Sequence, residues 1–88
     1  MEKKLTICNR LGLHARAATK FANVAKRYSC KIEVELGDQR IDGKSVMALM
    51  LLAAAKGSEI VVRANGEEAG QSLDALESLI NNRFDEED

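Results

Sequence analysis

The sequence predicts a two-layer α+β domain whose elements follow the order βαββαβα. Four short segments alternate apolar and polar residues, and three longer segments repeat apolar residues at helical spacing. Strands that each have one apolar face need helices on only one side of their sheet, which gives two layers. We expect residues 1–88 to form this single domain, without internal repeats or linkers.

The first strand and the first helix flank a short loop. Leu5 and Ile7 alternate with polar neighbours in a short half-buried strand, and residues 9–12 form the loop. From Ala15 onward the apolar residues follow helical spacing, and Ser29 and Cys30 end that element. The apolar positions of this predicted helix are Ala15, Ala18, Phe21, Ala22, Val24 and Ala25.

A hairpin follows the first helix. Ile32, Val34 and Leu36 alternate with charged residues in a strand that has one solvent-exposed face. Gly37-Asp38 is typical of a two-residue hairpin turn, so Gln39–Asp42 is expected to return as a short strand.

The second half of the chain contains two helices and one strand. We expect a helix over residues 46–56, stopped by Gly57, and then a strand and an Asn65-Gly66 turn. We interpret residues 85–88 as a solvated acidic tail. The predicted strand contains Ile60, Val62 and Ala64, and the predicted last helix has one stripe of Ala69, Leu73, Leu76, Ile80 and Phe84.

Composition and charge exclude several functional classes. The net charge is -1 and only Phe21, Tyr28 and Phe84 are aromatic, which argues against a nucleic-acid binder. No secretory pattern opens the chain and the longest apolar run has ten residues, so we expect a cytoplasmic protein that does not enter membranes. One histidine and two scattered cysteines form no zinc-binding spacing, and we expect no metal and no cofactor.

The single histidine, His14, lies where a loop gives way to a helix. A lone histidine at a helix start is commonly a loop or capping residue. However, the first backbone N–H groups of a helix attract anions, and Arg16 has no acidic partner three or four positions away. A neutral imidazole attacks phosphorus without a general base, whereas an acid–base hydrolase needs a second titratable group. The pattern indicates a histidine that carries a phosphoryl group.

The residues around His14 resemble a known family. The chain is similar to HPr, the histidine phosphocarrier of the bacterial phosphotransferase system, and the likeness covers essentially its whole length. The segments that carry the resemblance are Asn9-Arg10-Leu11-Gly12-Leu13-His14-Ala15-Arg16-Ala17-Ala18, Lys44-Ser45-Val46-Met47 and Lys56-Gly57.

The resemblance implies a fold and a chemistry. The fold would be an open-faced β-sandwich, with a four-stranded antiparallel sheet covered by three helices. His14 would accept phosphate on its δ nitrogen from phospho-enzyme I and pass it to a IIA-type domain, and the protein would be a monomer. Arg16 and the backbone of Ala15, Arg16 and Ala17 would contact the phosphate.

One departure and one subdivision of the family matter here. The family has proline after the arginine, whereas this chain has Ala17 and no proline at all. Ala17 loses the rigidity of proline but restores a backbone N–H near the phosphate, so we expect phospho-His14 to form with an altered lifetime or transfer rate. Asn9-Arg10-Leu11-Gly12 and the acidic ending resemble NPr, the nitrogen-related branch, which implies a regulatory relay.

Ser45 and the helix after it have further expected roles. Ser45 precedes an apolar run and is expected to be its N-cap. The resemblance also implies a regulatory phosphorylation site there, used by a serine kinase and phosphorylase. Because this helix is apolar all round, part of it should be exposed and serve as a docking patch for partner proteins. The expected docking residues are Val46, Met47, Met50 and Leu51.

Two other functions fit the pattern less well. The first is a regulatory adaptor that binds partners through the same surface, with Ser45 phosphorylation as the switch and His14 unused for transfer. The second is a split-βαβ domain for nucleic acid or a small ligand, which the lack of basic patches and aromatic residues disfavours.

Overall fold

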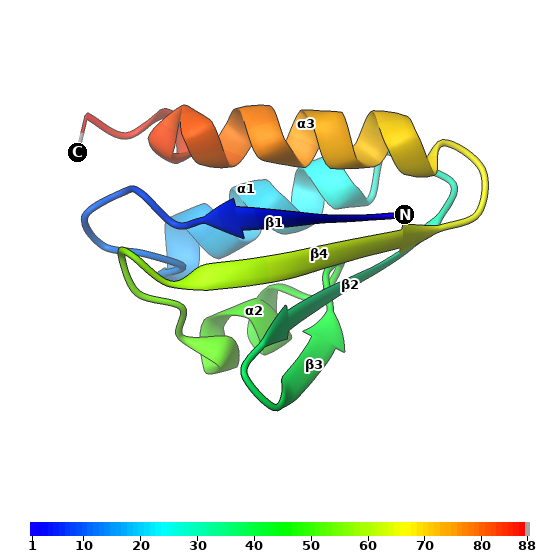
Figure 1. Cartoon of the computed structure of the whole chain (residues 1–88). Helices are drawn as coiled ribbons and strands as arrows, with labels where there is room; N and C mark the ends of the chain where they lie inside the picture. The colour runs from blue at the N-terminus through cyan, green and yellow to red at the C-terminus, as the bar shows by residue number, and fades with distance from the viewer. Residues whose placement is uncertain (88) are drawn as a thin grey trace.

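The computed structural model describes residues 1–87 and contains the predicted order of elements (Figure 1). A short 3-10 turn, η1, follows the last helix. The bounds are β1 (Glu2–Thr6), α1 (Ala15–Ala25), β2 (Lys31–Leu36), β3 (Gln39–Asp42), α2 (Val46–Leu52), β4 (Glu59–Asn65), α3 (Ala69–Asn81) and η1 (Arg83–Asp85).

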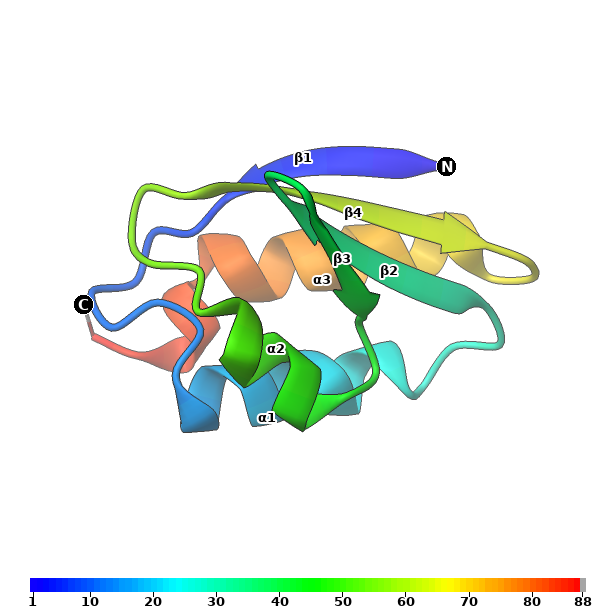
Figure 2. The same ribbon diagram turned by 90° about the horizontal axis from the view of Figure 1, so that it is seen from below.

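The strands form one antiparallel sheet in the order β1-β4-β2-β3. Val34 on β2 lies between Val62 on β4 and Ile41 on β3, and Leu5 on β1 faces Ile60 on β4. All three helices lie on one side of this sheet (Figure 2). The two-layer open-faced sandwich is therefore confirmed.

The core lies between the sheet and the helices. Alternate strand residues point into it because successive side chains of a strand face opposite sides. Helix α1 adds a face of small alanines around Phe21, which lets it pack close to its neighbours. The largest fully buried apolar side chains are Phe21, Phe84, Ile7, Ile32, Leu49, Ile60, Leu73, Leu76, Ile80, Val34 and Val62.

The expected ends of α2 and α1 are wrong. Helix α2 ends at Leu52 instead of Lys56, because Ala53 adopts a left-handed conformation with φ of 53°. This early end allows the Ala54 carbonyl to accept a hydrogen bond from the Leu13 N–H at 2.9 Å. Helix α1 ends at Ala25, four residues before Ser29.

The chain after α3 also differs from expectation. Phe84 is buried, as its place in the apolar stripe predicts, but α3 ends at Asn81 and Phe84 belongs to a separate turn. Arg83, Phe84 and Asp85 all have positive φ values, of 54°, 54° and 64°. This left-handed turn redirects the tail, so that Glu86 becomes largely buried instead of solvated. Within residues 1–87, no helix has the length and apolar character needed to cross a membrane.

Candidate functional site

His14 is the N-cap residue of α1. Its backbone is extended, with φ of -78° and ψ of -179°, and its side chain does not cap the helix. The first helical hydrogen bond runs from the Ala18 N–H to the His14 carbonyl at 2.8 Å. The N–H groups of Ala15, Arg16 and Ala17 therefore have no acceptor inside the helix, and together they favour an anion next to the imidazole.

The His14 loop is fixed against the end of α2. Gly12 has φ of 67°, a conformation that favours glycine, and the next residue, Leu13, hydrogen bonds to Ala54. Leu13 is itself buried in the core. The positive φ of Gly12 lets the loop turn sharply before Leu13 and His14.

The imidazole has a partner that the sequence did not predict. Nε2 of His14 lies 2.5 Å from Oε2 of Glu86, which comes from the C-terminal segment. The other carboxylate oxygen of Glu86 accepts a hydrogen bond from Nδ2 of Asn9 at 2.9 Å. The exposed fractions of the two side chains are 29% for His14 and 13% for Glu86, so the ring is more accessible than the carboxylate.

Asn9 joins the two parts of this arrangement. Its Nδ2 also donates to the Gly12 carbonyl at 2.9 Å, so one amide group supports both the His14 loop and Glu86. Asn9 is fully buried, and its Oδ1 has no hydrogen-bond partner among residues 1–87. An unpaired buried acceptor costs about 1–3 kcal/mol, which opposes the stabilisation from the two hydrogen bonds of Nδ2.

The Glu86 carboxyl is held in its ionised form. Partial burial by itself would raise its pKa, but hydrogen bonds from Asn9 and His14 oppose that effect. The positive potential of His14 and Arg16 acts in the same direction as the hydrogen bonds. As a result, the pKa of Glu86 lies below its usual value of 4.5.

A shallow groove of about 500 Å³ opens beside the imidazole. Arg16 is exposed at this groove, and no ion pair occupies its guanidinium among residues 1–87. Arg10, Leu11, Ala15, Glu86 and Glu87 complete the lining together with His14 and Arg16. A groove that combines an accessible imidazole, free backbone N–H groups and an arginine suits a phosphoryl group.

The expected docking residues lie mostly at the surface. The exposed fractions are 70% for Met47, 44% for Met50 and 76% for Leu51, whereas Val46 is half-buried. Leu11, in the loop before His14, is also 60% exposed. A second shallow groove, lined by Leu11, His14 and Met50 among others, connects the loop to the end of α2. The apolar surface is thus continuous with the imidazole.

Ser45 caps α2 as the sequence predicts. Its Oγ accepts a hydrogen bond from the Ala48 N–H at 3.2 Å, and its backbone is extended. No cluster of three or more histidine, cysteine or acidic side chains in residues 1–87 has the arrangement of a metal site.

Asn9 and Glu86 are the two site residues that sequence reasoning missed. An asparagine three residues before a glycine is a local signal for a side chain that bonds the backbone of its own turn. Glu86 has no such signal, because it lies 72 residues away from His14 in the sequence.

Comparison with known proteins agrees with the fold and shows the family of the chain. Residues 1–82 match the family model described as the PTS HPr component phosphorylation site. The phosphocarrier protein HPr of Pseudomonas aeruginosa is 52% identical over 84 residues, covering 94% of this chain and 93% of the relative. The phosphocarrier protein NPr of Shewanella violacea is 40% identical, covering 98% of this chain and 94% of the relative.

Solved structures of HPr proteins have the same fold as this chain. The HPr structure from Thermoanaerobacter tengcongensis superposes with a TM-score of 0.95 at 34% identity, covering 99% of this chain and 98% of that one. The phosphocarrier protein HPr from Bacillus anthracis gives a TM-score of 0.87 at 31% identity, covering 91% and 95%. With its fold, the placement of His14 and these matches along nearly its whole length, the chain belongs to the HPr family of phosphocarrier proteins of the phosphotransferase system.

Proposed function

We propose that His14 accepts a phosphoryl group on Nδ1 from a phosphorylated enzyme I-type protein and passes it to a IIA-type protein. The observation that carries this proposal is the position of the imidazole at the start of α1, beside three unpaired backbone N–H groups. The phosphoryl group originates from phosphoenolpyruvate, which places the relay in the cytoplasm. The protein itself carries the group as a phosphohistidine and needs no cofactor.

The charges around His14 suit this chemistry. A transferring phosphoryl group spreads negative charge over its outer oxygens, so its stabilisation is largely electrostatic. The N–H groups of Ala15, Arg16 and Ala17 provide fixed donors, and the exposed Arg16 guanidinium supplies a mobile positive charge. Their positions at one helix end support binding of the phosphoryl oxygens on the side of the ring that faces the groove.

Partner proteins would dock on the apolar surface next to His14. We define the docking patch as Val46, Met47, Met50 and Leu51. Methionine side chains adapt to differently shaped partners, which suits a carrier that meets a donor and an acceptor in turn. The patch borders the groove that reaches the imidazole, so a partner seated there would bring its own phosphoryl site to His14.

Ser45 would serve as a regulatory phosphorylation site. It lies at the start of α2, directly before the docking patch, and its side chain is half-buried. A phosphate there would place about two negative charges at the edge of the patch. Those charges would interfere with partner binding while the helix N-terminus tolerates them.

The carrier function is tested by incubating the purified protein with phosphoenolpyruvate and the enzyme I of the same genome. Intact mass should increase by one phosphate in the parent protein but not in the His14→Ala variant. The modification should be lost in acid and kept in alkali, as expected for phosphate bound to a histidine nitrogen. A folded parent that gains no phosphate, with an enzyme I that phosphorylates another carrier, would instead indicate an adaptor that has lost the relay.

A further inference from the structure

We infer that Glu86 is a positioning residue for the phosphoryl acceptor, holding His14 in the Nε2–H tautomer so that Nδ1 presents its lone pair to phosphorus. This inference rests on the proposed function of His14 and adds to it a specific task for the C-terminal segment. It follows from the 2.5 Å contact between Nε2 and the Glu86 carboxylate.

The proton count at this contact decides the tautomer. An ionised carboxylate has only acceptor sites, so the hydrogen of the contact must belong to Nε2 of His14. In the neutral state of the ring, from which it attacks phosphorus, the imidazole carries one N–H, which leaves Nδ1 with a free lone pair. The lowered pKa of Glu86 agrees with an ionised carboxylate. Within residues 1–87, no group forms a hydrogen bond with Nδ1, so that nitrogen remains available for attack.

The fold holds the Glu86 carboxylate through Asn9. Asn9 holds one of its oxygens and is itself fully buried, so the carboxylate is oriented by a rigid part of the core. Direct contact between a histidine ring and an oriented carboxylate is a common way to set the tautomer and the ring angle. The same Asn9 amide holds the Gly12 carbonyl, so the imidazole and its partner are positioned relative to one another.

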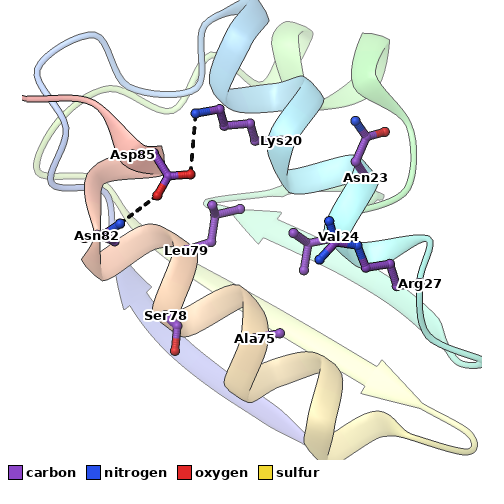
Figure 3. A pocket seen from close by; sticks show the side chains of 9 residues that line it. All are labelled: Lys20, Asn23, Val24, Arg27, Ala75, Ser78, Leu79, Asn82 and Asp85. Atoms are coloured by element: carbon purple, nitrogen blue, oxygen red, sulfur yellow. Dashed lines mark hydrogen bonds and ion pairs between the residues drawn. The ribbon is translucent and has the colours of Figure 1, made fainter.

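The left-handed turn before Glu86 delivers it to the site. Three consecutive residues with positive φ are unfavourable for side chains that have a Cβ atom, so other contacts must hold the turn. Phe84 is completely buried, and its carbonyl accepts a hydrogen bond from Nζ of Lys20 at 2.8 Å. Figure 3 shows Lys20 of α1 reaching Asp85, at 3.5 Å, while Asn82 bonds the same carboxylate at 2.6 Å.

With this tautomer, every bond, electron pair and proton of the transfer step is accounted for. The Nδ1 lone pair forms the new N–P bond, and the bond from phosphorus to the donor protein breaks with its electrons going to the donor. The ring keeps its hydrogen on Nε2 and becomes positively charged, and the Glu86 carboxylate faces that charge. When the phosphoryl group passes to the acceptor, the electrons of the N–P bond return to Nδ1 and the starting tautomer is restored.

Long-range ¹H–¹⁵N NMR of the unphosphorylated protein tests the tautomer without any partner protein. The parent should show the Nε2–H form of His14, and Glu86→Gln should keep it in part, because its amide oxygen still accepts a hydrogen bond. Glu86→Ala should give a mixture of both tautomers. Glu67→Gln is the matched control, since it removes an exposed carboxylate in the turn between β4 and α3 and should leave the parent spectrum unchanged.

Rates of phosphorylation by enzyme I provide the second measurement. Glu86→Ala should be slower by about tenfold or more, with Glu86→Gln intermediate and Glu67→Gln at the parent rate. A parent in the Nδ1–H form, an unchanged tautomer in Glu86→Ala, or faster phosphorylation of that variant would overturn the inference. Absence of phosphate on the parent would refute the proposed function, whereas the NMR result would still report on the positioning of the ring.

Discussion

Gly12 lies directly against the carbonyl group of Ala54. A Cβ atom at position 12 would stand 2.3 Å from the Ala54 oxygen, much closer than two such atoms approach. The neighbouring N–H of Leu13 donates to that same oxygen at 2.9 Å. The absence of a side chain at Gly12 therefore allows the His14 loop to meet the end of α2, and with it the docking patch.

The Gly12→Ala variant should lose about 2–4 kcal/mol of unfolding free energy, from a positive φ and a backbone overlap together. Gly37→Ala is the matched control, because Gly37 has a similar φ of 59° but open space around its Cβ position. It should lose only about 1–2 kcal/mol. Urea unfolding of both variants measures the difference, and equal losses would show that the approach to Ala54 is unimportant.

Ser45 should contribute to stability by accepting the hydrogen bond of the Ala48 N–H, a role that another acceptor side chain can also fill. Ser45→Ala removes the acceptor for the Ala48 N–H and should cost about 1 kcal/mol. Ser45→Asp supplies another acceptor and should stay close to the parent value. Chemical denaturation of the two variants checks this. If Ser45→Asp were as unstable as Ser45→Ala, the cap would not explain the residue's structural role.

The stability of the fold in acid should depend on Glu86. Because its folded pKa is lower than the usual 4.5, the folded state binds this proton less readily than the unfolded state does. The stabilisation is therefore complete above pH 4.5 and is lost as the pH falls through the folded pKa. Glu86→Gln lacks this group, so its unfolding free energy should fall less steeply below that pH.

Urea unfolding at a series of pH values compares the two proteins. The contacts that lower the Glu86 pKa come from Asn9, His14 and Arg16, so the loss of stability in acid reflects interactions within the candidate site. Parallel curves for the parent and Glu86→Gln would mean that Glu86 titrates equally in both states.

Most of the fold was predictable because its signals are local. Alternation in Ile32 and Val34, and helical spacing around Phe21, follow from which face of each element is buried. His14 was also predictable, since a histidine at a helix start next to an arginine is visible in a short stretch of sequence. The exposure of Met47, Met50 and Leu51 was predictable because α2 has more apolar surface than one sheet face covers.

The end of the chain was not predictable from local patterns. Periodicity placed Phe84 on the apolar stripe of α3, but tertiary contacts bury it after a left-handed turn. No single residue in the sequence indicates that turn. The acidic composition of the tail indicated solvent exposure, whereas Asn9 and His14, more than 70 positions away, bind Glu86. Such contacts depend on the assembled fold, and a single sequence does not encode them at any fixed spacing.

The docking patch should matter for transfer but not for folding. Met47→Asp adds a charge to a side chain that is 70% exposed, so the unfolding free energy should change by less than about 0.5 kcal/mol. Transfer from enzyme I should slow by about tenfold or more, because the partner must bury this charge. Quench-flow or mass spectrometry follows the transfer.

Gln71→Asp is the control for the Met47 variant. It adds the same charge at an exposed position near the start of α3, at the other end of the molecule from the His14 loop (Figure 1). Equal slowing by both variants would point to overall charge, and normal transfer by a folded Met47→Asp protein would count against the patch.

Ala17 offers the last test, because it replaces the proline of the family pattern. Its N–H has no acceptor within α1, so Ala17→Pro removes a free donor near the proposed phosphate position without breaking a helical hydrogen bond. If that donor holds the phosphoryl group at about 1 kcal/mol, its loss should speed hydrolysis of phospho-His14 by about fivefold. The decay of phosphorylated parent and variant, followed by intact mass, gives both rates. Unchanged hydrolysis and transfer in a folded Ala17→Pro protein would show that this N–H does not contact the phosphate, leaving Ala15 and Arg16 as the backbone donors.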